Sequence, residues 1–315
     1  MQKSYIILAH KNPGQLKLLI ERLADKQSHF YIHVDKNIEI EPFRAFESLA
    51  NVSFVNPREK GTWGDIGIVK GTLNALRQIL KDSRKGTVIL LSGQDYPIKT
   101  NEQINAYLDE NAGCDFIDIS PLDKVLNAPE WVEKLQFYKY NISDIRADHV
   151  LIPRLLSKYF YTLKTINKLG KVLLFRPGLL SKSSFYSHLV TKRIPYENIP
   201  SYAGGQWWAL SLETVDKIID FVDLNPDFIA HHQYTLLPDE IFFQSIIMRL
   251  CQNDPTIIFK PSLHYANWSR KNCPLPVTFV SSDLAELKQQ PHNMLYARKF
   301  DLETDKEIFE LLDSI

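Results

Sequence analysis

The first third of the chain alternates short apolar runs with longer segments in which apolar residues recur every three or four positions. The apolar runs cover residues 5–9, 30–34, 52–55 and 88–91, which have the length and content of buried strands. Helical spacing links leucines and isoleucines over 16–23, and again over 66–80. Strands that alternate with helices predict an α/β sandwich with a mainly parallel, Rossmann-like sheet flanked by helices.

Helix start signals extend this pattern. A helix is expected from Glu102, because Thr100 and Gln103 have the spacing of a capping box. Two further helices are expected in the second half of the chain, over 212–221 and from Pro238 onward.

Polar residues follow three of the predicted strands, in the loops after residues 9, 34 and 91. They are His10, Asp35 and Asp95. In an open parallel sheet, ligands bind beyond the carboxyl ends of the strands, and a carboxylate there accepts hydrogen bonds from ribose hydroxyls or a uracil N–H. A single Asp in a loop often only caps the turn, but the three together favour a nucleotide pocket. Neither G-x-G-x-x-G nor a P-loop motif occurs, which argues against the usual dinucleotide and P-loop sites.

Composition narrows the class of protein. The 315 residues contain 44% hydrophobic residues without repeats or low-complexity tracts, so we expect one domain with a nucleotide-binding half (1–120), an insert (121–200) and an acceptor or catalytic half (201–315). The net charge of zero gives no reason to expect a nucleic-acid partner. Three dispersed cysteines favour neither disulfides nor structural zinc, and the apolar run at the N-terminus is too short for a signal peptide or membrane span. These features predict a protein of a reducing compartment.

Charge is unevenly distributed along the chain. Residues 134–193 contain twelve Lys and Arg against two Asp and Glu, interleaved with aromatic residues. The bias suggests an anionic acceptor or the surface of an anionic membrane, where lipid-linked glycans are assembled. A solvated, basic helical insert is the equal alternative.

The sequence lacks the D-x-D carboxylate pair with which many sugar-nucleotide transferases hold a metal ion. Another group must then neutralise a leaving diphosphate. The adjacent Arg298 and Lys299 have the required charge, although a solvated basic pair is the simpler interpretation of these two residues alone.

A carboxylate pair and a tryptophan pair complete the candidate chemistry. Pro238 at the first helical position would place Asp239 and Glu240 in the first turn, where Glu240 lacks a capping partner and stays ionised, as a general base requires. Complementing the helix dipole is the alternative role for these acids. The segment 204–208 ends in Trp207 and Trp208, of which at most one can face a ligand if the segment is extended.

These segments, in this order, resemble the family of core-2/I-branching N-acetylglucosaminyltransferases and peptide xylosyltransferases, a metal-independent branch of the GT-A glycosyltransferases. The resemblance covers nearly the whole chain. It is carried by residues 7–10, 31–36, 62–64, 91–100, 204–210, 237–243 and 297–301.

The resemblance implies a role for each matching residue. Glu240 matches the general base. The donor site would consist of Ala9, His10, Asp35, Trp63, Asp95, Arg298 and Lys299. The acceptor site would consist of Gln206, Trp207, Trp208 and Asp239. Some members place a further arginine on the diphosphate, for which Arg270 is the nearest candidate in this chain.

The activity that follows from the resemblance is an inverting transfer without metal or other cofactor. A UDP-sugar, UDP-N-acetylglucosamine or UDP-xylose first of all, would donate to a hydroxyl of a glycan or lipid-linked saccharide and form a β-linkage. Eukaryotic members carry a membrane anchor and disulfides, so the resemblance points to a bacterial relative in the cytoplasm, peripheral on the inner face of the membrane. A non-catalytic carbohydrate-binding protein on the same fold and a metal-dependent nucleotide-sugar enzyme are the alternatives.

Overall fold

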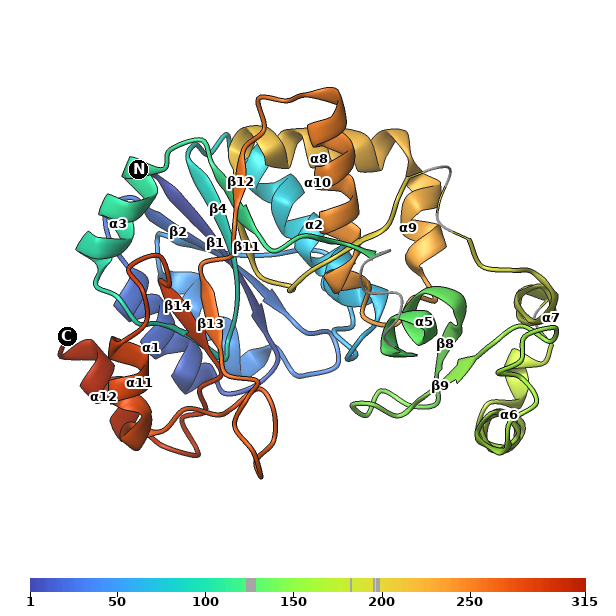
Figure 1. Cartoon of the computed structure of the whole chain (residues 1–315). Helices are drawn as coiled ribbons and strands as arrows, with labels where there is room; N and C mark the ends of the chain where they lie inside the picture. The colour runs from blue at the N-terminus through green and yellow to red at the C-terminus, as the bar shows by residue number, and fades with distance from the viewer. Residues whose placement is uncertain (123–128, 182, 195, 197–198) are drawn as a thin grey trace.

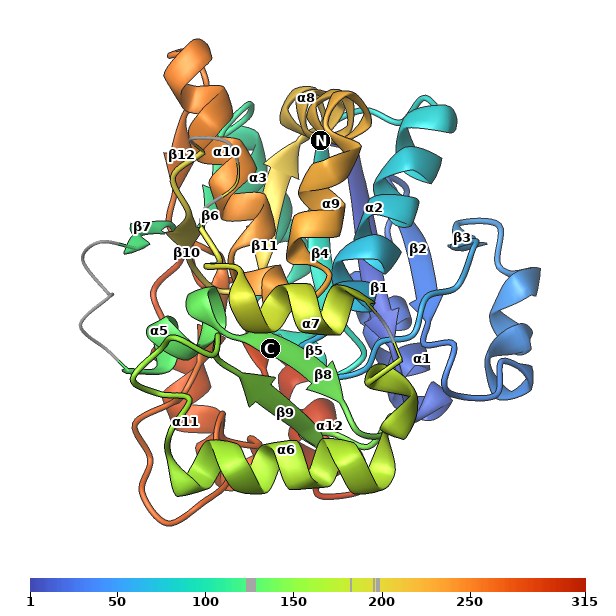
Figure 2. The same ribbon diagram turned by 90° about the vertical axis from the view of Figure 1, so that its right-hand side faces the viewer.

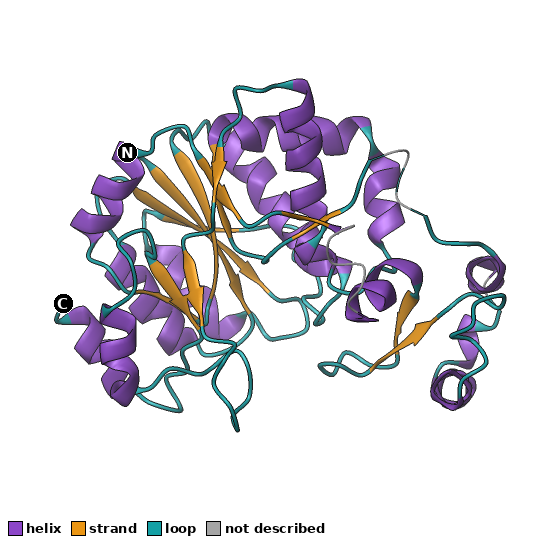
Figure 3. Ribbon diagram, in the orientation of Figure 1, coloured by secondary structure: helices purple, strands orange, loops and turns teal. Residues whose placement is uncertain are grey.

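The computed structural model describes residues 1–122, 129–181, 183–194, 196 and 199–315. Their main sheet has seven strands in the order β12-β6-β11-β4-β1-β2-β3, with helices on both faces (Figures 1 and 3). The strands are β1 (Lys3–Ala9), β2 (Ser28–Val34), β3 (Val52–Phe54), β4 (Thr87–Ser92), β6 (Asp115–Ile117), β11 (Trp208–Ser211) and β12 (Phe259–Lys260). All pairs are parallel except those of β11 with β4 and β6, so the sheet is mainly parallel, as predicted.

Alternation along β1 divides the core between the two faces of the sheet. Tyr5 and Ile7 face one layer, which contains α1 (Pro13–Leu23), α3 (Asn101–Glu110), α11 (Leu284–Lys288) and α12 (Glu307–Asp313). Ile6 faces the other layer, which contains α2 (Ile66–Lys81), α8 (Leu212–Leu224), α9 (Pro226–His232) and α10 (Phe242–Asn253). Since both faces are covered, the central strands β1, β2 and β4 are buried at nearly every position.

The capping box predicted at the start of α3 forms in the structure. The Thr100 hydroxyl accepts a hydrogen bond from the Gln103 backbone N–H at 3.3 Å, and the Gln103 side chain accepts one from the Thr100 N–H at 3.0 Å. The capping box that starts α3 is therefore confirmed.

A second, three-stranded sheet stands beside the first. It consists of β13 (His264–Ala266), β14 (Tyr296–Arg298) and β5 (Asp95–Pro97), and β14 pairs with both neighbours. This sheet brings residues near the C-terminus against the loop that follows β4. The main body also contains a short antiparallel pair of strands, β7 (Ser120–Pro121) and β10 (Tyr202–Ala203). Two 3-10 turns belong to it as well, η1 (Glu41–Ser48) and η4 (Ser281–Asp283).

The basic segment forms an arm that projects from the main body (Figures 1 and 2). The arm consists of α5 (Pro129–Gln136), β8 (Tyr138–Asn141), β9 (His149–Ile152), α6 (Leu163–Phe175), η2 (Pro177–Leu179) and α7 (Ser183–Val190). A small core of its own, centred on Tyr140, Val172 and Phe185, holds these elements together. The predicted helical insert thus also contains an antiparallel hairpin, which the charge pattern did not reveal.

One predicted helix is wrong at its start. Pro238 opens only a 3-10 turn, η3 (Pro238–Glu240), and α10 begins separately at Phe242. The chain leaves helical geometry at Ile241, where φ is −133°. Asp239 and Glu240 therefore precede the long helix, and the argument from its dipole does not apply to them.

In the described part of the chain, every helix falls short of the length and apolar character that a membrane crossing requires.

Candidate active site

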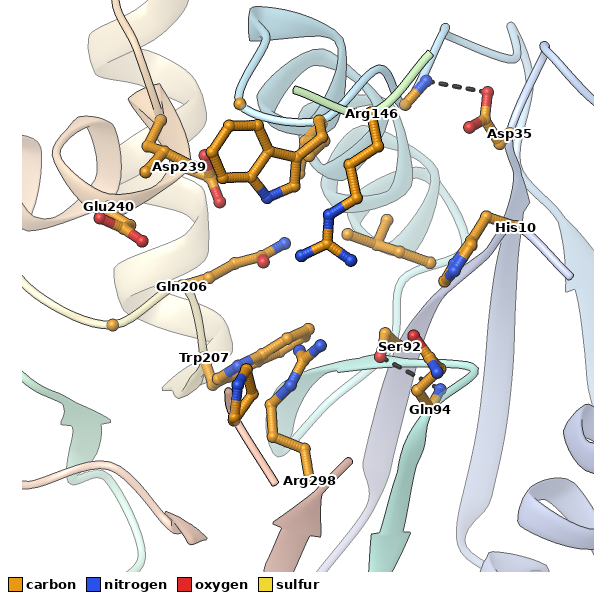
Figure 4. A pocket seen from close by; sticks show the side chains of 18 of the residues that line it. His10, Asp35, Ser92, Gln94, Arg146, Gln206, Trp207, Asp239, Glu240 and Arg298 are labelled. Atoms are coloured by element: carbon orange, nitrogen blue, oxygen red, sulfur yellow. Dashed lines mark hydrogen bonds between the residues drawn. The ribbon is translucent and has the colours of Figure 1, made fainter. Parts of the chain in front are cut away.

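A cavity of about 700 Å³ lies at the carboxyl ends of β1, β2 and β4. Nine of the twelve residues selected from the sequence line its wall (Figure 4). They are Ala9, His10, Asp35, Trp63, Gln206, Trp207, Asp239, Glu240 and Arg298. His10 and Asp35, which follow their strands, thus share one cavity with the candidates from the second half of the chain.

The carboxylate of Asp35 accepts hydrogen bonds from loop backbone and also lines the cavity. Its Oδ1 accepts hydrogen bonds from the backbone N–H groups of Asn37 at 2.8 Å and Gly61 at 2.9 Å. A Cβ atom on Gly61 would lie only 2.8 Å from Asp35 Oδ2, so a glycine leaves room for the carboxylate. The two interpretations of this Asp, loop cap and pocket residue, thus describe the same side chain.

Arg298 contributes a largely buried cation to the cavity wall. Its guanidinium carbon lies 4.2 Å from the centre of the Trp207 ring, and one of its nitrogens lies 4.0 Å from Asp95 Oδ1. At that distance the carboxylate balances the charge without forming a hydrogen bond. No side-chain hydrogen bond of Arg298 occurs among the described residues, which leaves its N–H groups available to an anionic ligand.

Asp95 lies behind the wall, where we had expected it to contact the donor. The side chain is fully buried, and its Oδ2 accepts hydrogen bonds from the Ser92 backbone N–H at 2.5 Å and the Ser92 hydroxyl at 2.6 Å. Burial raises the pKa of this carboxyl, and the nearby charge of Arg298 lowers it. We therefore reassign Asp95 from ligand contact to holding the β4 loop and Arg298 in place.

Trp208 and Lys299 also lie off the cavity wall. Trp208 is fully buried in the core, with its ring centre 5.4 Å from that of Phe243, so it is removed from the acceptor candidates. Lys299 follows Arg298 directly and does not line the cavity. Trp207 directly precedes β11, and neighbours in extended backbone point to opposite sides, which explains why one tryptophan lines the wall and the other fills the core.

Glu240 forms an ion pair with Lys134 of the arm. Lys134 Nζ lies 2.6 Å from Glu240 Oε2 and 3.9 Å from the centre of the Trp131 ring. The glutamate side chain is 28% exposed and that of the lysine 11%. The lysine thus contacts the Trp131 ring and fixes one of the two carboxylate oxygens of Glu240. Sequence reasoning missed Lys134 because 106 positions separate the partners.

Asp239 is held in a different environment from its neighbour. It is buried, and its Oδ1 has no hydrogen-bond partner among the described residues. Burial, followed by the charge of Glu240, raises the pKa of Asp239 from 3.8 to about 7. Near neutral pH this carboxyl is thus divided between its protonated and ionised forms.

Arg146 is a cavity residue that the sequence analysis missed. It lies in the turn between β8 and β9, and its guanidinium carbon is 5.8 Å from the centre of the Trp63 ring. Figure 4 shows the side chains of Arg146 and Arg298 directed into the same space from opposite sides. The only signal in the sequence was the excess of basic residues in the arm.

The structure does not place Arg270, the candidate for an additional arginine on the diphosphate, in the cavity. Its guanidinium pairs with Asp283 at 2.8 Å and with Glu286 at 2.9 Å, and it does not line the cavity. Arg146 supplies the second guanidinium of the wall instead.

The described residues contain no group of three or more His, Cys, Asp or Glu side chains placed to hold a metal ion.

Comparison with known proteins identifies the family of this chain. The model of the Core-2/I-Branching enzyme family matches residues 4–156 and 177–290. The chain belongs to this family.

Curated relatives agree with this assignment. Xylosyltransferase 2 of Rattus norvegicus is 25% identical over 98% of this chain and 33% of its own length. Xylosyltransferase 1 of Homo sapiens is 24% identical over 98% of this chain and 30% of its own. The chain spans about a third of the length of the curated relatives it matches. Among solved structures, a putative glucose-1-phosphate thymidylyltransferase from Bacillus anthracis matches with a TM-score of 0.33 and 10% identity, over 82% of this chain and 86% of that one, which is too low to carry an argument.

The unpaired carboxyl of Asp239 predicts a stability that depends on pH. The folded protein binds this proton more tightly than the unfolded chain does, so the group makes folding less favourable as pH rises from 3.8 to about 7. Asp239→Asn removes this effect and should gain stability relative to the parent protein between pH 5 and pH 8, by at most about 3 kcal/mol. Urea unfolding at both pH values measures the difference.

Asp216→Asn, at an exposed position of α8, is the control for loss of a negative charge. A stability difference between Asp239→Asn and the parent that stays constant with pH would show that Asp239 is ionised throughout.

Proposed function

We propose that this member of a glycosyltransferase family moves a sugar from a UDP-sugar to an acceptor hydroxyl in one inverting step, without a metal ion. N-acetylglucosamine and xylose are the sugars we favour, and a glycan or lipid-linked saccharide is the acceptor. The observation that carries the proposal is the layout of the cavity (Figure 4). The carboxylate of Glu240, paired with a lysine, lies on one wall. The guanidinium groups of Arg146 and Arg298 point into another part of the same cavity.

The nucleoside would occupy the strand-end side of the cavity. Ala9, His10 and Asp35 form that side, next to the backbone of Gly61. Burial and the charge of Lys11 lower the pKa of His10, so its imidazole is neutral at neutral pH and offers one donor and one acceptor. A neutral ring and a carboxylate fit the uncharged uracil and the ribose hydroxyls.

The diphosphate would lie between Arg298 and Arg146. Their planar guanidinium groups donate to phosphate oxygens in pairs, and neither has an anionic partner within hydrogen-bond distance among the described residues. Lys299 lies close to these cations, because its pKa is lowered by burial and then by the positive charges of Arg146 and Arg298. This concentration of positive charge stabilises the departing diphosphate, the role that a divalent cation has in metal-dependent transferases.

Glu240 would act as the general base. As the acceptor oxygen attacks the anomeric carbon, its proton passes to the Glu240 carboxylate, and the bond from that carbon to the UDP oxygen breaks on the opposite side. The bond electrons leave with UDP, and an α-linked donor gives a β-linked product. Lys134 binds Oε2, which leaves Oε1 of Glu240 as the oxygen that receives the proton.

Trp207 and Gln206 would bind the sugar and the acceptor. Trp207 lines the cavity beside Arg298, and indole faces stack on the apolar faces of sugar rings. The unpartnered oxygen of Asp239 is available to position an acceptor hydroxyl on the same wall as Glu240.

Turnover should continue in the absence of divalent cations, because guanidinium groups supply the charge on the diphosphate. Sugar transfer measured in excess EDTA is expected to stay close to the rate without chelator. Loss of transfer in EDTA, restored by manganese, would instead identify a metal-dependent enzyme.

Arg146→Ala should weaken UDP binding by about tenfold or more, since a charge-assisted hydrogen bond is lost from the diphosphate. Isothermal titration calorimetry with UDP and with uridine separates the effects, and uridine affinity should be unchanged. Lys158→Ala is the matched control, a cation of the same arm outside the cavity. Equal UDP affinity in the Arg146 variant and the parent would remove Arg146 from the donor site.

Glu240→Gln should lower kcat by about 10²–10⁴-fold, the usual contribution of a general base, and leave UDP affinity unchanged. The amide keeps the size of the carboxylate but cannot accept the proton. Asp239→Asn serves as the neighbouring control and should lose much less activity. If Asp239→Asn abolishes transfer while Glu240→Gln remains active, the base has been assigned to the wrong carboxyl.

A further inference from the structure

Helix α6 of the arm has three distinct faces. Thr165, Leu169 and Val172 face the β8–β9 hairpin and the small core of the arm. Lysines 164, 168 and 171 follow one another along a second face at helical spacing. The third face, away from the hairpin, consists of the apolar residues Leu163, Ile166, Leu173 and Leu174.

This outer face is uncovered. Leu163 is 80% exposed and Leu174 is 76% exposed. Elsewhere in the arm Leu156, Tyr161, Tyr186 and Val190 are exposed as well, as is Phe175 at the end of α6. Of the twenty large hydrophobic side chains that are exposed among the described residues, thirteen lie between Ile145 and Ile194. A concentration of this kind marks an interaction surface, because single exposed apolar residues are normally scattered.

Positive charge accompanies the apolar surface. The segment 134–193 contains twelve Lys and Arg residues and only two acidic residues. Lys164 pairs with Glu133 at 3.0 Å, whereas Lys171 forms no ion pair among the described residues. Two copies of such a surface would repel one another. A negatively charged partner would be attracted.

We propose that the outer face of α6, with its flanking lysines, docks on the surface of an anionic lipid bilayer. The helix has 13 residues and is therefore about 20 Å long, which suits a helix that lies in the interface with its apolar side toward the acyl chains. The flanking ammonium groups would remain among anionic headgroups. Figure 2 shows α6 and α7 at the outside of the molecule, which leaves this face open to a flat surface.

The arm also connects the docking face to the cavity. Arg193 is buried at its base and donates hydrogen bonds to the carbonyl oxygens of Phe137 at 2.9 Å and His231 at 3.1 Å, which ties the arm to the main body. The same arm contributes Arg146 to the cavity wall. A docked arm would therefore hold the cavity close to the membrane, where an acceptor carried on a lipid is found. This last step rests on the proposed function, whereas docking itself does not.

Co-sedimentation with vesicles tests the docking. The parent protein should bind vesicles of phosphatidylcholine mixed with phosphatidylglycerol, bind less to phosphatidylcholine alone, and dissociate as salt rises. The double substitution L173E/L174E should reduce binding by about tenfold or more, because it places two anions on the apolar face. The matched control is Leu224→Glu, which changes an exposed leucine of α8 in the main body and should bind as the parent does.

Calorimetry with UDP and circular dichroism accompany each variant. L173E/L174E should keep the fold and the UDP affinity of the parent, so that a failure of docking is distinguished from a failure of the proposed donor site. Absence of binding by the parent at low salt, or equal binding by parent and L173E/L174E, would overturn the proposal. So would light scattering that shows a parent dimer and a monomeric L173E/L174E, since the face would then join two copies of the chain.

Discussion

The cavity depends on the register in which three parallel strands end side by side. Ala9 of β1 pairs with Val34 of β2, and Leu8 pairs with Ser92 of β4, so the chain leaves all three strands at the same edge. His10, Asp35 and the Ser92 loop are brought together by this alignment alone. Because a parallel sheet covered on both faces has its register fixed by packing, the donor side of the cavity is built into the hydrophobic core.

Ion pairs between distant segments complete the site on that foundation. Arg298 comes to the cavity because β14 pairs with β5, which places it opposite Asp95. Glu240 is paired with Lys134, a residue of the arm. Loss of one partner of a largely buried pair leaves an uncompensated charge, so these contacts fix the geometry of the site more firmly than they stabilise the fold.

The arm contributes both to the cavity and to the exposed surface of the molecule. It supplies Arg146 to the cavity wall and Lys134 to the ion pair with Glu240, and it exposes the apolar and basic faces of α6. Asp239, on the wall that Lys134 borders, has an oxygen without a partner and a raised pKa. An unsatisfied buried polar atom is costly, and such atoms are found where a ligand completes the hydrogen bonding. The cavity is thus a joint product of the sheet and the insert.

The sequence by itself determined β1 to β4, the helices α1 and α2, the capping box of α3 and the position of His10 and Asp35 at the ends of their strands. These features depend on periodicity and on short-range hydrogen bonds, which neighbouring residues decide. The same periodicity could not fix the break at Ile241, where the chain leaves helical geometry between two turns. Only the tertiary structure decided that Trp207 lines the cavity while Trp208 fills the core, that Asp95 supports Arg298 from behind, and that Arg146 and Lys134 reach the site. Each of these depends on contacts across many tens of residues, and the pairing of distant segments leaves no periodic trace in the chain.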